Sequence, residues 1–242
     1  MTRSPFRFQR FAIEDDQCGM KIGTDAVLLG AWANAQRKER ILDIGTGCGL
    51  IALMLSQRTE KNATRIDAID QDENAAIQAA ENVANSPWPD RIVVSHQPLQ
   101  EFDSAEHAGL YDLCVCNPPY FSDCSPSFDS QKSAARHTVA LTHEQLLNCS
   151  NRLLQPGGKL CVVLPYDQLD SILSTARQAN FFLHRQTSVR PLPEAPFKRV
   201  LLEFGLQESE IERDELVIEV RRHEFSADYE ALTGQFHLRF AK

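Results

Sequence analysis

The sequence has few of the features that mark membrane, secreted or repetitive proteins. No apolar run among its 242 residues approaches the roughly 20 residues needed to cross a bilayer. The first ten residues hold arginines but neither an apolar stretch nor a small-residue cleavage site, so we expect no secretory signal and no membrane contact. No internal repeat or low-complexity tract is present. With 43% hydrophobic and 24% charged residues, the composition is that of an ordinary globular chain.

The seven cysteines show neither a disulfide framework nor the spacing of a zinc site. An odd number of scattered thiols fits a reducing compartment, so we expect a cytoplasmic protein. Zinc ligands are paired at loop spacing, whereas Cys114 and Cys116 lie inside an apolar, strand-like run. We therefore expect these thiols to fill the core, and we expect no metal.

The net charge of −8 disfavours binding to a polyanion, because phosphate neutralisation needs clustered Lys and Arg. The distribution weakens this objection. Basic residues gather near the N-terminus and again late in the chain: Arg3, Arg7, Arg10, then Arg185, Arg190, Lys198 and Arg199. Much of the acid lies between Glu208 and Glu219, which we interpret as a solvated connection.

From residue 40 onward, apolar strand-like runs alternate with helical segments. The strand-like runs are 41–44, 65–70, 91–94, 111–116, 158–164 and 200–204. The helical segments are 49–57, 72–84, 143–154 and 168–179. This alternation predicts an α/β fold, with a parallel sheet covered by helices on both faces. Thr24 is expected to cap a helix that ends near Asn34, and Ser226 a C-terminal helix. We expect one domain, residues 21–242, behind a flexible N-terminal arm, residues 1–20.

A glycine-rich turn follows the first of these strands and opens a helix. It reads Asp43-Ile-Gly45-Thr-Gly47-Cys-Gly49, and glycines there permit a tight turn and close approach of a ligand. The third glycine comes one residue earlier than in the dinucleotide fingerprint, although a nicotinamide enzyme with an irregular turn stays an alternative. The charge of Asp43 suits a positive amino group of a ligand, or backbone amides that the carboxylate holds. Asp70 ends the second strand, where an acid binds ribose hydroxyls.

This pattern resembles motifs I and II of the Rossmann-like class I methyltransferases, which bind S-adenosylmethionine. The resemblance implies a mostly parallel, seven-stranded sheet with helices on both faces. It also implies that Gly45, Gly47 and Gly49, with Asp43 and Asp70, form the cofactor site.

The fourth strand runs into Asn117-Pro118-Pro119-Tyr120, which resembles the N-P-P-Y motif of amino-group methyltransferases. Ligands of open α/β sheets bind beyond the carboxyl ends of the strands, so Asn117 should face the cofactor. The Asn117 side-chain carbonyl and the Pro118 backbone carbonyl can accept hydrogen bonds from an adenine amine, which favours a pyramidal nitrogen. Prolines stiffen the turn, and Tyr120 offers a ring for base stacking. The motif also occurs in enzymes that methylate DNA adenine, rRNA guanine and release-factor glutamine.

Further segments resemble the bacterial tRNA (adenosine-37-N6) methyltransferases that act on a valine tRNA. They are residues 20–32 (Met-Lys-Ile-Gly-Thr-Asp-Ala-Val-Leu-Leu-Gly-Ala-Trp), residues 6–11, Cys18-Gly19, residues 135–137 and residues 225–239. The resemblance implies that Lys21, Thr24 and Asp25 lie at the methionine end of S-adenosylmethionine. The third strand lacks the usual acid of the adenine site, so Gln97 is expected there.

The same resemblance implies a tRNA substrate, and we expect a monomer. The candidates for RNA contact are Arg3, Arg7, Arg10, Lys198 and Arg199. Release-factor glutamine methyltransferases share the two central motifs but have a helical domain ahead of them. Here about forty residues precede the first strand, which leaves little room for such a domain.

Overall fold

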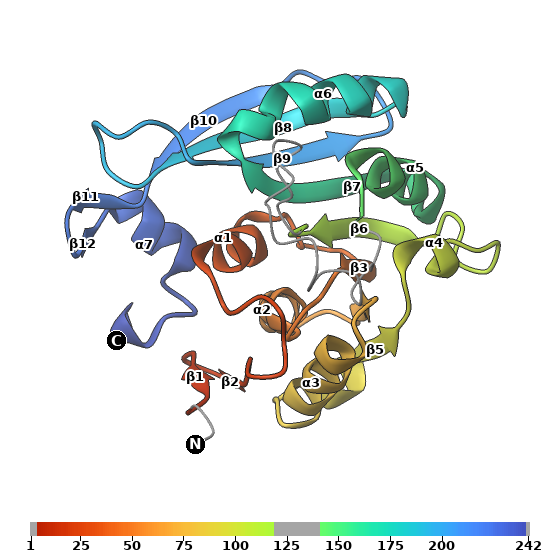
Figure 1. The fold of residues 1–242 in the computed structure, drawn as a ribbon, viewed down its shortest axis with the longest axis horizontal. Coiled ribbons are helices and arrows are strands. Elements are labelled where there is room, and N and C mark those ends of the chain that lie inside the picture. The colour runs from red at the N-terminus through yellow and green to blue at the C-terminus, as the bar shows by residue number, and fades with distance from the viewer. Residues whose placement is uncertain (1–3, 119–140, 241–242) are drawn as a thin grey trace, which may run out of the picture.

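An eight-stranded sheet forms the centre of the protein in the computed structural model, which describes residues 4–118 and 141–240 (Figure 1). The strand order is β10-β8-β9-β7-β6-β3-β4-β5. In that order the strands are Glu212–Val217, Phe182–Arg190, Arg199–Gly205, Leu154–Pro165, Tyr111–Cys116, Arg40–Ile44, Arg65–Asp70 and Ile92–His96. All neighbours pair in parallel except the two pairs that include β9.

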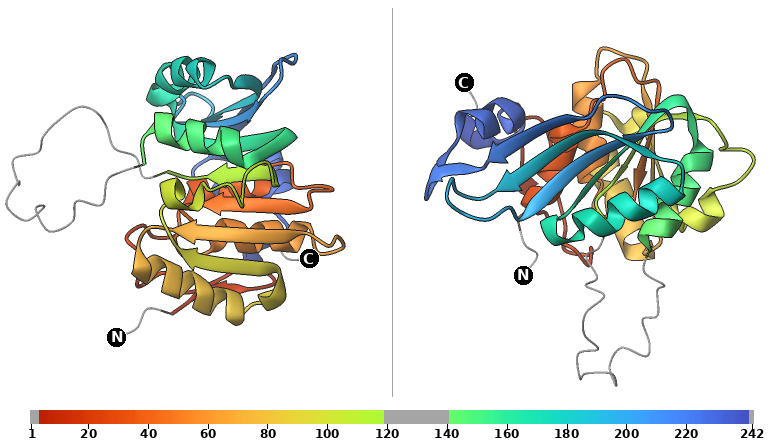
Figure 2. Two further views of the ribbon diagram at one scale, coloured as in Figure 1. Left: turned by 90° about the vertical axis from the view of Figure 1, so that its right-hand side faces the viewer. Right: turned by 90° about the horizontal axis from the view of Figure 1, so that it is seen from above.

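Helices cover both faces of this sheet (Figure 2). One face packs against α1 (Thr24–Trp32), α2 (Leu50–Arg58), α3 (Glu73–Ala84) and α7 (Ala227–Thr233). The other face packs against α4 (Leu99–Phe102), α5 (His143–Leu153) and α6 (Leu169–Gln178). The predicted α/β class and the two-sided helical cover are confirmed. Within the described residues, no helix combines the length and apolar character that a membrane span requires.

The continuous apolar runs of the central strands follow from burial on both faces. In β3, Ile41 belongs to the core beneath α1 and α2, whereas Leu42 and Ile44 belong to the core beneath α5. Successive residues of a strand point to opposite faces, so a strand covered on both sides needs apolar residues on both faces. The register Ile44↔Cys116 places β6 directly beside β3. The glycine turn after β3 and the segment after β6 therefore leave the sheet side by side.

Two predictions about helix ends have different outcomes. Ser226 caps α7, because its hydroxyl accepts a hydrogen bond from the Tyr229 amide at 3.0 Å. The predicted cap at Thr24 is wrong: Thr24 is the first helical residue, and Gly23 occupies the cap position without a side-chain bond. The backbone is extended at Gly23, with φ −131° and ψ 165°, and helical from Thr24, so the helix begins one residue earlier than expected.

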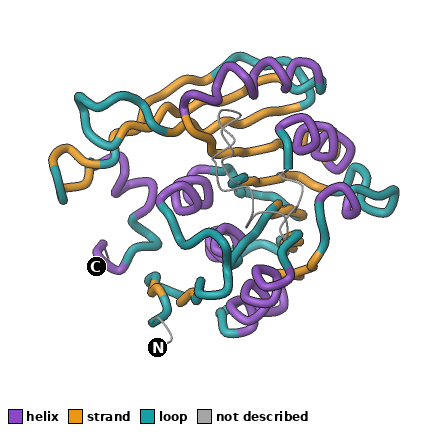
Figure 3. Tube along the Cα trace, in the orientation of Figure 1, coloured by secondary structure: helices purple, strands orange, loops and turns teal. Residues whose placement is uncertain are grey.

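The acidic segment 208–219 is not only a solvated connection, because residues 212–217 form the edge strand β10. Figure 3 shows it as a strand beside β8. Glu212, Asp214 and their neighbours are exposed, and Leu216 is the buried residue of the strand. Charged side chains are common on edge strands, where they prevent pairing with other chains. This strand and β8 add two strands to the six runs found in the sequence, so the sheet has eight strands rather than the seven that the resemblance implies.

Part of the segment expected to form an N-terminal arm packs against the rest of the protein. The short strands β1 (Phe6–Arg7) and β2 (Ala12–Ile13) form a hairpin, and Phe8, Phe11 and Ile13 lie in the core at 3%, 7% and 1% exposure. These apolar side chains remove too much surface from water for the segment to stay solvated. A second hairpin, β11 (Glu219–Arg221) and β12 (Glu224–Phe225), precedes α7.

Candidate active site

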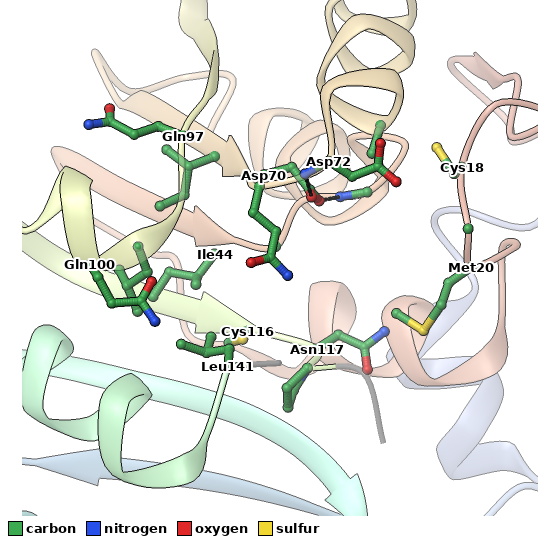
Figure 4. Close-up of a pocket in the computed structure, with 18 residues that line it drawn as sticks. Cys18, Met20, Ile44, Asp70, Asp72, Gln97, Gln100, Cys116, Asn117 and Leu141 are labelled. Carbon is green, nitrogen blue, oxygen red and sulfur yellow. Dashed lines mark hydrogen bonds between the residues drawn. The ribbon is translucent and has the colours of Figure 1, made fainter. Parts of the chain in front are cut away.

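A cavity of about 220 Å³ opens where β3, β4 and β6 end at the carboxyl edge of the sheet (Figure 4). Its apolar lining includes Ile44, Ile69, Leu99, Cys116 and Leu141. Its polar lining includes Asp70, Gln97, Gln100 and Asn117. A mostly apolar cleft with a few polar groups is the usual form of a small-molecule site. Its position at the strand ends is the one expected for open α/β sheets.

The glycine turn supplies open backbone to this cavity. Gly45 and Gly47 line it, with φ of +68° and +56°, and a Cβ at either position would meet nothing within 4 Å. Residues that carry a side chain rarely adopt such φ values, so glycine keeps the turn unstrained and leaves space for a ligand. Gly49 has a different part. It does not line the cavity, and a Cβ there would lie 3.4 Å from Cβ of Ala79, so Gly49 lets α2 pack closely against α3.

The Asp70 carboxylate joins the glycine turn to the end of β4. It accepts hydrogen bonds from the amides of Gly47 at 2.8 Å and Asp72 at 2.9 Å. Burial is the main cause that raises the pKa of Asp70 above its ordinary value. A carboxylate can accept about four hydrogen bonds, so this group can also accept from ligand hydroxyls. Asp72 caps α3 by accepting from the Asn74 amide.

Asp43 lies beneath the turn and does not line the cavity. It is fully buried, and its Oδ2 accepts from Oγ1 of Thr46 at 2.7 Å and from the Ala52 amide at 3.1 Å. Asp43 was predicted either to bind a positive amino group of the ligand or to hold backbone amides. The geometry favours the second role, because the carboxylate holds the turn and the start of α2. Burial raises the pKa of Asp43 to about 7, although both hydrogen bonds oppose the rise.

Replacing Asp43 with Asn should change how stability depends on pH. A carboxyl whose pKa is higher in the folded chain binds an extra proton there, so the free energy of unfolding falls as pH rises from about 4 to about 7. In Asp43→Asn this part of the fall should be missing. Urea unfolding of both proteins at pH 4.5, 6 and 7.5 would measure it, and parallel curves for the two would contradict the buried titration.

The segment before α1 forms the rim of the cavity rather than its wall. The Lys21 ammonium donates to backbone carbonyls of residues 15, 16 and 18, and so holds the loop whose Cys18, Gly19 and Met20 line the cavity. Lys21 therefore does not point at the ligand space. Met20 was not predicted as a site residue. Its side chain is 48% exposed and lies toward Asn117 (Figure 4).

Asp25 and Thr24 lie at the start of α1 and are absent from the cavity lining. The Asp25 carboxylate pairs with the Arg199 guanidinium at 2.8 Å, which ties α1 to the beginning of β9. Trp32 is buried, and its indole N–H donates to Oγ1 of Thr187 at 2.8 Å. Residues 21–32 thus support the site from outside the lining of the cavity.

The motif after β6 reaches the cavity from the side of Met20. Asn117 and Pro118 both line the cavity, as the strand order requires. Pro119, Tyr120 and the segment 135–137 lie outside the described residues, so their predicted parts stay predictions.

The end of the cavity remote from Asn117 is formed after β5. Gln97 lies there, and its backbone amide donates to the Asp70 carbonyl at 2.8 Å. Gln100, which sequence reasoning missed, lines the same end. Gln100 lies in α4, whereas Gln97 precedes that helix, and both line the cavity. Its closeness to Gln97 in the chain was the signal available in the sequence.

The predicted RNA contacts lie at opposite edges of the sheet. Lys198 and Arg199 lie where β9 begins, at the same edge as the cavity. Arg10 lies beyond the end of α2, at the amino edge, where its guanidinium pairs with Glu60 at 2.6 Å and stacks on Trp88 at 5.2 Å. Arg10 therefore fixes the N-terminal hairpin and is far from the cavity. Arg7 is exposed in β1, and Arg3 lies outside the described residues.

These features fit S-adenosylmethionine. Open glycine backbone suits its amino acid part, the Asp70 carboxylate suits ribose hydroxyls, and the apolar lining suits an adenine ring. An amide side chain followed by proline at the other end of the cavity suits the binding of an amine. The site and fold together define an S-adenosylmethionine-dependent methyltransferase of the Rossmann-like class.

Comparison with known proteins gives the same class. The family model described as "Methyltransferase small domain" matches residues 19–178. A crystal structure of a predicted O-methyltransferase from Agrobacterium tumefaciens superposes with a TM-score of 0.70, at 18% identity, over 88% of this chain and 96% of that one. TYW2 from Pyrococcus horikoshii, solved with MeSAdo, superposes with a TM-score of 0.58, at 13% identity, over 84% and 70%. At these identities the likeness shows the fold alone.

Sequence relatives specify the family. The tRNA1(Val) (adenine(37)-N6)-methyltransferase of Parabacteroides distasonis is 42% identical over 99% of this chain and 100% of its own length. Proteins of the same name from Bacteroides thetaiotaomicron and Trichodesmium erythraeum are 44% and 39% identical, over 96% and 99% of this chain and 97% and 100% of theirs. The chain belongs to the tRNA1(Val) (adenine(37)-N6)-methyltransferase family.

Proposed function

We propose that the protein transfers a methyl group from S-adenosylmethionine to N6 of adenosine 37 in a valine-accepting tRNA, the reaction named for its relatives. One observation supports this most directly. A single cavity joins the glycine turn and Asp70 to Asn117 and Pro118, so a methyl donor and an amine can meet in it.

The proposed cofactor contacts divide into two groups. Gly45, Gly47, Asp70 and Gln97, with Asn117 at the far end, line the cavity and can touch the cofactor directly. The other predicted cofactor residues support them from behind: Asp43 under the turn, Gly49 between helices, and Lys21, Thr24 and Asp25 behind the rim. We add Gln100 to the direct contacts, because it lines the end where the apolar side chains would hold adenine.

Asn117 and Pro118 are proposed to hold the amine that is methylated. When bound, S-adenosylmethionine supplies an electrophilic methyl group on a sulfonium. The adenine amine is a weak nucleophile, because its lone pair is delocalised into the ring. Two acceptors, the Asn117 amide oxygen and the Pro118 carbonyl, would bind its two hydrogens and favour a pyramidal nitrogen. No strong base is needed before transfer, since the released proton can leave to water afterwards, and positioning carries the rate.

Proline at 118 and 119 fixes φ and removes competing N–H donors, which keeps the acceptors aimed at the amine. Tyr120 is proposed to stack on the extruded base. Adenosine 37 lies in a loop, where a purine turns outward at modest cost because no base pair must break.

Lys198 and Arg199 are proposed to contact RNA beside the cavity, whereas the position of Arg10 does not support a contact there. We also propose a monomer that acts in the cytoplasm. The six cysteines of the described residues are free thiols, which is typical of a reducing compartment.

The test is methylation of defined RNA by the purified protein with labelled S-adenosylmethionine. We expect label in a valine tRNA transcript, recovered as N6-methyladenosine by mass spectrometry of nucleosides. A transcript with guanosine at position 37 is the matched control and should take up none. Methylation of a release-factor glutamine or of DNA by active protein, without N6-methyladenosine in tRNA, would refute the proposal.

A further inference from the structure

Aromatic and basic side chains gather beside the active site, in a part of the fold that the methyl transfer does not use. Tyr166 directly follows β7, and Phe197 and Lys198 lie in the loop that joins β8 to β9. This loop is at the edge of the sheet toward which β6 and β7 run (Figure 1). The Tyr166 amide donates to the Lys198 carbonyl at 3.1 Å, so the loop is held against the end of β7.

Strand register sets the separation of this cluster from the active site. Cys116 of β6 pairs with Val162 of β7. Asn117 is the next residue on one strand, and Tyr166 comes four residues later on the other. Strands rise about 3.3 Å per residue and lie about 4.8 Å apart, so the backbone positions of Asn117 and Tyr166 are roughly 10 Å from each other. A nucleic acid strand whose base occupies the cavity therefore passes close to Tyr166.

The side chains of the cluster hold one another in place. The rings of Tyr166 and Phe197 have centroids 5.0 Å apart and planes inclined by 32°. The Arg190 guanidinium carbon lies 3.9 Å from the Phe197 centroid. Arg190 is itself fixed by the Glu215 carboxylate at 2.7 Å and the Pro193 carbonyl at 3.1 Å. Both rings are half-buried, so each keeps part of its surface in contact with solvent.

We propose that Tyr166 and Phe197 form a stacking platform for an unpaired base of the tRNA loop that flanks the target adenosine. This inference rests on the proposed function. Proteins that bind single-stranded nucleic acid combine aromatic rings, on which bases stack, with basic groups along the backbone. Arg190 pre-orients Phe197, since its own charge is paired with Glu215, and exposed Lys198 supplies the phosphate contact.

A tRNA platform and a purely structural cluster predict different results. We would replace Tyr166 with Ala and with Leu, and Phe197 with Leu, and measure tRNA affinity across a range of salt concentrations with S-adenosylhomocysteine present. Stacking on a base is worth about 1–3 kcal/mol, so we expect affinity to fall about 5- to 150-fold. The slope of affinity against salt should not change, because no phosphate contact is lost. Tyr166→Phe, which keeps the ring, should bind as the wild type does.

Two further variants serve as matched controls. Phe182 is 37% exposed at the opposite end of β8, and Phe182→Leu should leave tRNA affinity unchanged. Lys198→Gln should weaken binding and reduce the salt slope by about one. The platform is refuted if the ring-removing variants bind tRNA within twofold of the wild type, or if their loss is matched by weaker cofactor binding and a lower melting temperature. Failure of the proposed function differs from both, because the wild type itself would then not methylate the tRNA.

Discussion

Asn117→Ala should lose most methyl transfer while its affinity for S-adenosylmethionine stays near that of the wild type. Asn117 directly follows β6 and lines the cavity at the end opposite Gln97 and Gln100. Its side-chain oxygen is one of the two acceptors proposed for the target amine. Removing one pre-positioned hydrogen-bonding group from a transition state typically lowers the rate about 10²–10³-fold. The glycine turn and Asp70, which we propose to hold most of the cofactor, are unchanged by the substitution.

The measurement is single-turnover methylation of valine tRNA beside calorimetric binding of S-adenosylhomocysteine. Asn117→Asp is the informative second variant, because it keeps an oxygen acceptor at the same position and should retain more activity than Asn117→Ala. Transfer by Asn117→Ala at near the wild-type rate would remove Asn117 from the proposed reaction. Equal loss of cofactor affinity and rate would instead place its main contact on the cofactor.

The fold was predictable wherever the sequence had a strong periodic signal. The central strands present apolar residues to both faces and alternate with segments of helical pattern, so β4 and β6 were placed to the residue. β8 and the edge strand β10 were missed because β8 is half-exposed and β10 is mostly charged. An edge strand is stabilised by backbone pairing with its neighbour, and the local sequence records little of that.

The residues that form the glycine turn of the candidate site were predictable, whereas the contacts of several side chains were not. Glycines and Asp70 were located because their chemistry is local to a strand end. The parts of Asp43 and Lys21 depend on which amides and carbonyls lie nearby, and these belong to residues that the fold, not the motif, brings close. Arg10 shows the same limit: it is near other basic residues in sequence, yet it pairs with Glu60 at the far edge of the sheet.

Asp70→Ala should weaken S-adenosylmethionine binding by about 1–3 kcal/mol, or roughly 5- to 150-fold. The substitution removes the carboxylate proposed to accept from the ribose hydroxyls. It also releases the Gly47 amide, which Asp70 holds at 2.8 Å, so the glycine turn loses one of its hydrogen bonds to β4. Both effects act on the cofactor rather than on the RNA, and tRNA affinity should therefore change little. Calorimetry with S-adenosylhomocysteine measures the first quantity directly.

Asp72→Ala is the matched control, because it removes a carboxyl two residues away that also lines the cavity. Asp72 caps α3, so its loss should lower stability by about 1 kcal/mol with little effect on cofactor affinity. Dependence on pH separates the two further. The pKa of Asp70 is raised by burial, and protonation removes an acceptor, so wild-type affinity should fall on acidification at a higher pH than an exposed aspartate would cause. Asp70→Asn should bind weakly at every pH, and a wild-type pH profile in that variant would assign the titration to another group.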